Sequence, residues 1–347
     1  MATTFPGGSN TFVPSTEASN NMVVDFSRNP RKFALSQYCQ YVPVKKNIGL
    51  YYKMTVEMAG RVLNDDLSDL AWPDGAEAPS QIGNLEEFGI EQFHTKRYAP
   101  GFRIGELAAD QADWDVLAQH ARIHAQRMMT ARTVKAQTVL QNTANYPTGH
   151  TSLVTDIPDV TTYWDLATTN NMVIKRSLDY AADQIQKATL GAVEPDEMIF
   201  VIGPDIARRI TVSQEFRDHI KQSPQALQTL KGEIGPKNNF GMPEELYGYK
   251  CVVEKTVRVT NRKGSAKATS YVLPGTRAMM LSRPGGLEGV EGAPSFSTAT
   301  IFLKEEMTVE SKHDRDNRRH VGRVVDDFDS IITAGIAGYL FQSPLSS

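Results

Sequence analysis

The sequence predicts an α+β protein, and three observations carry that prediction. No glycine or proline occurs between Gly105 and Pro147, and this stretch is rich in alanine, glutamine, arginine and methionine, which is typical of one long helix. Short β-branched segments accumulate later in the chain, so helices come first and strands follow. Near the C-terminus two long extended segments flank a charged connection, the pattern of an antiparallel strand pair.

Composition places the chain among ordinary globular proteins. It has 347 residues, 40% hydrophobic and 22% charged, with a formal net charge of −3. That charge does not support nucleic-acid binding through a strongly basic surface, so any such contact should be weak or locally arranged. Cys39 and Cys251 are too few for a disulfide framework. We find no apolar run long enough to span a membrane and no signal peptide, so we expect no membrane association.

The first 105 residues predict an arm followed by a long extended loop. Residues 1 to about 30 are rich in Ser, Thr, Asn, Gly and Pro, a composition that cannot bury a core of its own. Residues 47–64 and 86–105 have the character of two extended limbs, joined by a turn-rich polar segment. Nine acidic residues occur between Glu57 and Glu91, against Arg61 alone. A polar excursion of this length is typical of a functional loop.

The long helix is expected to begin near Asp110 or Asp113, either of which can serve as its N-cap. About 30 residues at 1.5 Å each predict a rod of roughly 45 Å. His120 and His124 are four residues apart, but no third ligand is near in the sequence, so we interpret them as solvated helix residues rather than metal ligands. One apolar stripe is expected to face the core, formed by Trp114, Leu117, Ala121, Ala125, Met128, Val139 and Leu140.

The middle of the chain predicts a mixed domain. A second amphipathic helix, "IKRSLDYAADQIQKAT", precedes "EMIFVIGPDIARRI", which has the pattern of a buried strand, a Gly-Pro turn and a short helix. The turn matches no phosphate-binding motif, and Pro204 lacks the backbone donor that a phosphate needs, so we discount a nucleotide site. Further short strands are expected in "ELYGYKCVVEKTVRVT", "ATSYVLPG" and "RAMMLSRPGG".

The C-terminal strand pair contains the most conspicuous charge cluster. "ATIFLKEEMTVE" alternates apolar and polar residues, with Glu305 the one polar residue on the apolar side, and "SKHDRDNRR" is expected to be the solvated turn before a second extended stretch, residues 320–341. His313 and His320 are badly spaced for one metal, and a calcium loop fails because Arg318 occupies a ligand position. We find no hydrolase or metalloprotease motif, so we expect no enzyme activity, no metal and no cofactor.

This order of parts resembles the major capsid proteins of tailed bacteriophages with the Hong Kong 97-type fold. The phrases that carry the resemblance are "MIFVIGPDIARRI", "ELYGYKCVVEKTV" and the terminal pair "TATIFLKEEMTVES" with "HVGRVVDDFDSIITAGIAGYLF", and it covers about Phe33 to Phe341. The resemblance implies an N-terminal arm, an extended β-hairpin loop, a long spine helix, a peripheral domain and an axial domain. The implied boundaries are 1–46 for the arm, 47–105 for the loop, 106–190 and 295–333 for the peripheral domain, and 191–294 and 334–347 for the axial domain.

The resemblance also implies function and partners. The chain would self-assemble, as hexamers and pentamers, into the icosahedral head of a tailed phage in the host bacterial cytoplasm, with a portal, a separate scaffolding protein and possible decoration proteins. The shell would enclose double-stranded DNA without sequence-specific binding. The alternative within the same fold is a cellular, encapsulin-like nanocompartment shell around an enzyme cargo. Some relatives form a covalent link between a loop lysine and an asparagine of the next subunit; here Met54–Thr95 contains no lysine, so we expect non-covalent contacts.

Contacts between subunits are expected from the acidic loop, the arm and the spine helix. An acidic loop laid over the basic helix or arm of a neighbour would set the register of the shell, although the same loop is also explained as a solvated surface. Apolar loop residues should contribute more than exposed charges, which are screened by salt. The predicted contact residues are Arg28, Arg31, Lys32, Asp65, Asp66, Leu70, Trp72, Asp74, Glu77, Leu85, Arg122, Arg127 and Arg132.

Overall fold

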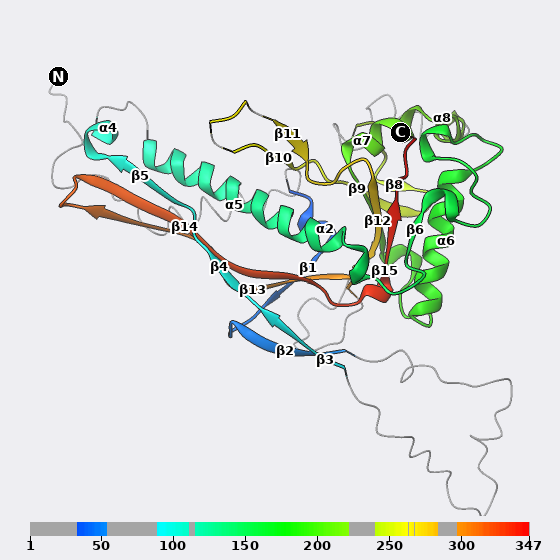
Figure 1. Cartoon of the computed structure of the whole chain (residues 1–347), viewed down its shortest axis with the longest axis horizontal. Helices are drawn as coiled ribbons and strands as arrows, with labels where there is room; N and C mark the ends of the chain where they lie inside the picture. The colour runs from blue at the N-terminus through cyan, green and yellow to red at the C-terminus, as the bar shows by residue number, and fades with distance from the viewer. Residues whose placement is uncertain are drawn as a thin grey trace, which may run out of the picture.

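The computed structural model shows two sheets, two separate two-stranded ribbons and several helices (Figure 1). It describes residues 33–53, 89–110, 115–221, 240–262, 264–266, 268–283 and 297–346. The α+β character predicted from the sequence is confirmed, but strands also occur before the long helix and not only after it. Within the described residues, no helix combines the length and the apolar character needed to cross a membrane.

A five-stranded sheet is built around one long hairpin. Its two central strands pair antiparallel from Ala299 opposite Ile332 to Asp314 opposite Arg319, so the charged run is the end of a hairpin, as predicted. One short strand adds parallel to the first hairpin strand, and two add antiparallel to the second. The members are β1 (Gln40–Pro43), β4 (Lys96–Tyr98), β5 (Gly101–Gly105), β13 (Ala299–Asp314) and β14 (Arg319–Ile332).

The first hairpin strand is less regular than its sequence pattern. Its register against β14 shifts between Leu303 and Glu305, and again between Glu305 and Thr308. Such irregularities insert extra residues into one strand and turn the side chains that follow. Met307 and Val309 are buried beyond the shifts, whereas Glu305 is half-buried and pairs with a neighbouring strand. The register shifts flank Glu305, the residue that already departed from the alternation in the sequence.

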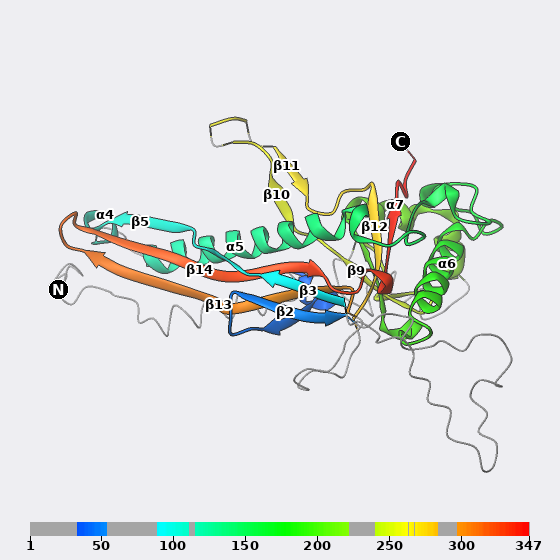
Figure 2. The same ribbon diagram turned by 60° about the horizontal axis from the view of Figure 1, so that its bottom comes forward.

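The long helix α5 (Val116–Leu140) lies along the hairpin (Figures 1 and 2). Its N-cap is Asp115, whose side chain accepts a hydrogen bond from the backbone N–H of Ala118 at 2.9 Å. The predicted cap at Asp110 is wrong, because Asp110 ends the separate short helix α4 (Glu106–Asp110), and Asp113 lies outside the described residues. The helix has 25 residues, or about 37 Å at 1.5 Å per residue, which is shorter than predicted.

The buried face of α5 includes most of the predicted stripe and several polar residues besides. Leu117, Ala121, Ala125, Met128 and Leu140 are buried as predicted. Val139 is only half-buried, and Trp114 lies outside the described residues. The polar residues on the buried face are Arg132, Thr133 and Gln137.

The second sheet has six strands, in the order β6-β15-β12-β7-β9-β8. Its strand β7 pairs parallel with β9 and antiparallel with β12, and β15 pairs parallel with β6. The strands are β6 (Thr151–Leu153), β7 (Met198–Ile202), β8 (Glu245–Leu246), β9 (Tyr249–Val253), β12 (Arg277–Ser282) and β15 (Gly338–Gln342), and the accompanying helices are α6 (Val173–Ala188), α7 (Pro204–Val212) and α8 (Gln214–Lys221).

Alternate residues of β7 contribute to two different hydrophobic clusters. Phe200 and Ile202 pack in one cluster with Trp164 and the buried face of α6. Ile199 and Val201 pack in the other, with α5 and the hairpin. Because both faces are covered, all five residues of β7 are buried, and the strand has a continuous apolar sequence. The six-stranded sheet thus joins the two halves of the core.

The extended stretch predicted to run from residue 320 to 341 is divided between the two sheets. β14 ends at Ile332, a short 3-10 helix follows (Gly335–Ala337), and β15 then enters the six-stranded sheet. Two hydrogen bonds from Thr333 fix the chain where it passes from one sheet to the other. Its backbone N–H donates to the carbonyl oxygen of Thr298, and its hydroxyl donates to the carbonyl oxygen of Ser297. Sequence pattern alone cannot distinguish one long strand from two strands separated by such a crossing.

Two ribbons lie on opposite sides of α5 in both views (Figures 1 and 2). One pairs β2 (Ile48–Lys53) with β3 (Gly89–His94), and the other pairs β10 (Val257–Val259) with β11 (Thr269–Tyr271). The limb predicted over 86–105 is therefore divided in its described part, since 89–94 pairs with β2 and 96–105 contributes β4 and β5 to the hairpin sheet. The residues between β2 and β3, 54–88, lie outside the described part.

Candidate inter-subunit surfaces

The histidines of the charged hairpin end face each other across the two strands. His313 and His320 are paired in register, with ring centroids 4.8 Å apart. Nε2 of His313 is 3.9 Å from the carboxylate of Glu106, and burial, with His313 beside it, lowers the pKa of His320. Searching the described residues finds no group of three His, Cys, Asp or Glu side chains that could hold a metal ion. The pair is a packed contact at the hairpin end.

His120 and His124 lie next to an aromatic ring rather than in open solvent. Phe102 of β5 stacks on both, with ring centroids 5.9 Å from His120 and 5.3 Å from His124. Their own centroids are 6.5 Å apart. Both side chains are half-buried, so the interpretation of solvated histidines is corrected to a stacked group between the helix and β5.

The strand–turn–helix at Gly203 is explained by packing. Gly203 is the N-cap of α7 and Pro204 its first residue, as the sequence pattern predicted. A Cβ atom on Gly203 would lie 2.4 Å from the carbonyl oxygen of Leu273, which is backbone and cannot move aside. The glycine is therefore needed for the close approach of two chain segments, which accounts for it without a bound phosphate.

Arg132, which we predicted to contact a neighbouring subunit, is instead bound inside its own. Only 4% of its surface is exposed, and its guanidinium donates two hydrogen bonds to Asp326 of β14. Burial raises the pKa of the Asp326 carboxyl, because desolvation of the charge outweighs the nearby guanidinium. Arg132 therefore joins helix to hairpin, and the prediction of an inter-subunit role for it is withdrawn.

A second buried polar network joins the first described residues to the rest of the core. Tyr38 donates to the carboxylate of Glu254 at 2.7 Å and accepts from the side-chain amide of Gln137 at 2.8 Å. Glu254 also accepts from the N–H and hydroxyl of Thr256. Burial raises the pKa of Glu254 despite these donors. One helix, one sheet and the segment beginning at Phe33 are thereby held together.

One face of the β2–β3 ribbon exposes apolar side chains to solvent. Ile48 and Leu50 lie on one face of the ribbon, together with Ile90, and these three side chains are 57%, 60% and 58% exposed. The opposite face is packed, since Phe93 stacks on Phe302 of the hairpin with centroids 4.3 Å apart. Contiguous exposed apolar side chains of this kind mark interaction surfaces. The sequence interpretation missed this face, although the alternation in "NIGLYY" could have indicated it.

Two of the predicted contact residues lie on the described surface. Arg122 and Arg127 are exposed on α5, and neither forms an ion pair with another described residue. The remaining predicted contacts lie outside the described residues; these are Arg28, Arg31, Lys32, Asp65, Asp66, Leu70, Trp72, Asp74, Glu77 and Leu85.

Comparison with known proteins finds similarity at the level of structure. No protein-family model matches the chain, and no curated protein matches it significantly in sequence. A phage-related protein from Bordetella bronchiseptica RB50 superposes with a TM-score of 0.63 at 13% identity, over 94% of this chain and 98% of that one.

Two further structures superpose over most of their length. The capsid of the cyanophage P-SCSP1u gives a TM-score of 0.53 at 9% identity, over 89% of this chain and 87% of that one. A chain of Mycobacterium phage Bobi gives 0.50 at 11%, over 91% of both. These likenesses, at low identity, are likenesses of fold, and they show that the chain has the Hong Kong 97-type capsid fold.

Proposed function

We propose that this chain, with its Hong Kong 97-type fold, is the major capsid protein of a tailed double-stranded DNA bacteriophage, and that its copies form the icosahedral head around the genome. The observation that carries the proposal is the exposed apolar face of Ile48, Leu50 and Ile90, on a protein whose fold is that of capsid subunits. A monomer gains nothing from such a face, whereas a shell subunit can bury it against a neighbour.

The energetics favour apolar contact as the main attraction between subunits. Burying a Leu or Ile side chain stabilises an interface by about 1.5–3 kcal/mol, whereas an exposed ion pair contributes about 0–1 kcal/mol and weakens with salt. Three such side chains would together contribute about 4.5–9 kcal/mol for each copy that buries them. Leu70, Trp72 and Leu85 of the acidic loop are proposed to add to the same contact.

The parts of the chain are proposed to have the roles that the fold suggests. Residues 1–46 would be the arm, 47–105 the extended loop, 106–190 with 295–333 the peripheral domain, and 191–294 with 334–347 the axial domain. The acidic loop, including Asp65, Asp66, Asp74 and Glu77, would contact a neighbouring subunit. The basic residues Arg28, Arg31 and Lys32 of the arm are its proposed partners.

The subunit is proposed to act structurally rather than catalytically. Hexamers and pentamers would assemble in the host bacterial cytoplasm with a scaffolding protein and a portal, and decoration proteins could add to the outer surface. Packaged DNA would be held without sequence-specific contacts. These partners follow from the proposed function.

Electron microscopy of the protein expressed together with its scaffolding protein, with and without Leu50→Asp, tests the proposal. We expect the wild-type protein to form closed icosahedral shells, and the variant to remain as soluble subunits because a buried carboxylate opposes contact. Phe93→Asp is not a suitable control, since Phe93 is packed within the subunit; Lys46→Asp, an exposed site just before β2, serves instead. Shells from Leu50→Asp, or small shells filled with cargo protein in the native source, would contradict the proposal.

A further inference from the structure

The chain contains two basic segments with no acidic residue. From Lys255 to Leu287 the sequence has basic residues at 255, 258, 262, 263, 267, 277 and 283 and no Asp or Glu, although the whole chain has a net charge of −3. Helix α5 likewise has no acidic residue from Val116 to Leu140. Local positive charge in a chain of negative net charge favours contact with a polyanion.

The structure places these two segments together. The ribbon β10–β11 projects from the six-stranded sheet and passes over the C-terminal turns of α5 (Figure 1). A hollow of about 180 Å³ lies between them, lined by Arg258 of the ribbon and by Thr138, Gln141 and Asn142 at the end of the helix. Thr138 and Gln141 donate within the subunit, to Val134 and to Gln137 and Val272 respectively. Arg258 and the side-chain amide of Asn142 are therefore the groups of the hollow that can donate to a phosphate.

Beyond the hollow, the same face of α5 carries a further arginine. Arg127 lies eleven residues before Thr138, which returns it to the same face of an α-helix. Arg127, Arg258 and Arg262 are all exposed, and none of them forms an ion pair with any described residue. We call the surface formed by these three arginines the basic face.

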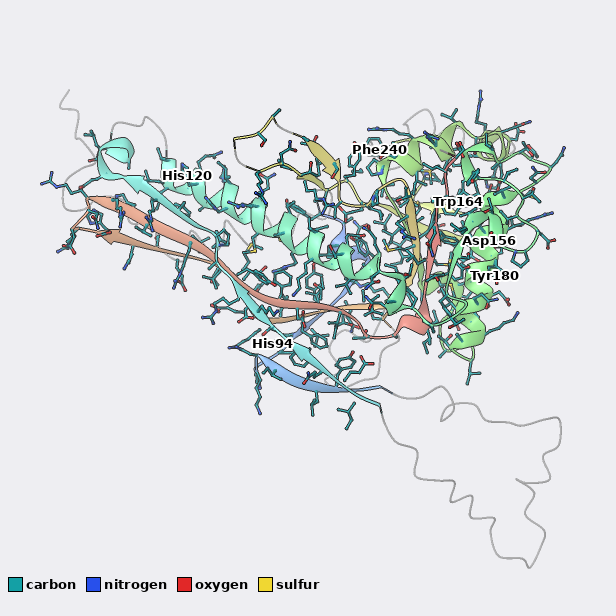
Figure 3. All side chains as sticks on the ribbon, viewed as in Figure 1. His94, His120, Asp156, Trp164, Tyr180 and Phe240 are labelled. Atoms are coloured by element: carbon teal, nitrogen blue, oxygen red, sulfur yellow. The ribbon has the colours of Figure 1, made fainter. Side chains whose placement is uncertain are left out.

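On the opposite side of the molecule, two exposed arginines have acidic partners. On the face of the hairpin sheet turned away from α5, Arg97 pairs with Glu305 at 3.3 Å and Arg323 pairs with Glu310. The β2–β3 ribbon packs on that side too, and Figure 3 shows its His94 across the sheet from His120 of α5. Acidic partners are thus present on the sheet side, and the basic face lacks them among the described residues.

In a closed shell, the side of the subunit that faces inward determines which polyanions can reach the basic face. Every subunit of a closed shell presents the same side inward. The acidic loop is joined to β2 and β3, and these two strands lie on the sheet side of the subunit. The basic face lies on the other side of α5 from the strands that carry the acidic loop, which is the partner that the sequence suggested for Arg127.

Resting on the proposed function, we infer that the basic face lines the interior of the shell and binds the phosphate backbone of the enclosed double-stranded DNA, with Arg258 at its centre. A backbone contact of this kind is independent of base sequence and strongly dependent on salt. Arg258 and Arg262 are exposed on a ribbon that projects from the six-stranded sheet, so a duplex can reach both.

The test compares two full-length triple variants with equal charge change. Arg127→Gln/Arg258→Gln/Arg262→Gln alters the basic face, and Arg97→Gln/Arg103→Gln/Arg323→Gln alters exposed arginines on the sheet side. Binding of unassembled subunits to a labelled random-sequence DNA duplex is measured by fluorescence anisotropy over a series of salt concentrations. Each lost phosphate contact should reduce the slope of log K against log salt by about 0.9.

For the basic-face variant, we expect the slope of log K against log salt to be smaller in magnitude by about two to three. This variant should also bind DNA at least about tenfold more weakly than wild type at 0.1 M salt. The sheet-side variant should bind like wild type. Both should still form shells in the electron microscope. Unchanged DNA binding by the basic-face variant would overturn the inference. So would loss of shells with DNA binding intact, because the face would then contact another subunit. Failure of the wild type to form shells in the presence of its scaffolding protein would instead contradict the proposed function.

A second measurement tests whether the basic face points into the shell or out of it. Ser265 lies exposed in the ribbon, and both native cysteines are buried, so Ser265→Cys provides one accessible thiol within the described residues. A maleimide attached to a polyethylene glycol too large for the shell pores should label unassembled subunits and spare intact shells. Equal labelling of intact shells would place the ribbon outside and overturn the inference.

Discussion

The guanidinium of Arg132 forms a two-pronged contact with the carboxylate of Asp326, through Nε to Oδ2 at 3.1 Å and Nη2 to Oδ1 at 2.6 Å. The two residues lie 194 positions apart in the sequence and are both buried. Their contact fixes the long helix α5 against the long hairpin. Aromatic rings of Tyr41 and Phe328 lie 5.9 and 5.3 Å from the guanidinium and exclude water from it.

Breaking one side of this pair should be far more harmful than removing both. Arg132→Met leaves a buried carboxylate without its partner, so the free energy of unfolding of the subunit should fall by about 3–5 kcal/mol. The double variant Arg132→Met/Asp326→Leu should recover most of that loss. Urea unfolding measures both, with Arg127→Met as an exposed control expected within about 0.5 kcal/mol of wild type. Equal losses in Arg132→Met and Arg127→Met would show that the buried pair has no special role.

Gly203→Ala tests whether the Gly-Pro turn is a packing feature. The new Cβ would meet the carbonyl oxygen of Leu273, so we expect a loss of about 1–3 kcal/mol in the free energy of unfolding. Gly105→Ala is the matched control, because nothing lies within 4 Å of a Cβ there. The comparison is made by urea denaturation of unassembled subunits. Similar stabilities for the two variants would contradict the packing explanation.

Deletion of the arm should separate assembly from folding. Removal of Met1–Asn29 spares the buried Phe33, Leu35 and Tyr38, so the subunit should fold with nearly unchanged stability yet fail to form regular shells. Removal of residues 1–39 takes away those buried side chains and should prevent folding. Circular dichroism and electron microscopy of the two deletions report the two properties. Regular shells from the shorter deletion would show that the arm is dispensable.

His150 should contribute to loss of stability in mild acid. Its Nδ1 is 2.8 Å from the carbonyl oxygen of Gly338, and burial lowers its pKa below the ordinary value near 6.5. The folded state therefore binds fewer protons than the unfolded state, and stability present above about pH 6.5 is lost as the pH falls. His150→Gln keeps an N–H donor without the titration. Unfolding free energies at pH 7.5 and 5.5 should fall more for wild type than for the variant; equal falls would exclude His150 as a cause.

Mature particles should contain no covalent links between subunits. The stretch Met54–Thr95 lacks lysine, and Lys96 belongs to β4, where its backbone pairs with Phe328 inside the hairpin sheet. Lys53 is the last residue of β2, so both lysines lie at the base of the loop. Without an amine between them, no isopeptide bond can form at the tip of the loop. Particles boiled in detergent with reducing agent should migrate as one band near 38 kDa. A ladder of multimers would contradict this expectation.

Sequence reasoning succeeded where a local pattern has one structural solution. The absence of glycine and proline predicted the long helix, and the turn-rich charged run between β-branched segments predicted the hairpin. It failed at positions where local options are equivalent. Asp110, Asp113 and Asp115 are all acceptable N-caps by sequence, and in the described part of the chain it is Asp115 that accepts from Ala118. Likewise Arg122, Arg127 and Arg132 look alike in sequence, yet Arg132 is buried and the other two are exposed.

The sequence by itself determined the α+β class, the order of the main helices and strands, and the uneven distribution of charge along the chain, because these depend on near neighbours. The tertiary structure alone decided that Arg132 meets Asp326, that Ile48, Leu50 and Ile90 share an exposed face, and that Arg258 and Arg127 lie on one side of the molecule. Such relationships join residues from 40 to almost 200 positions apart, and they depend on how strands and helices pack, which no local pattern specifies.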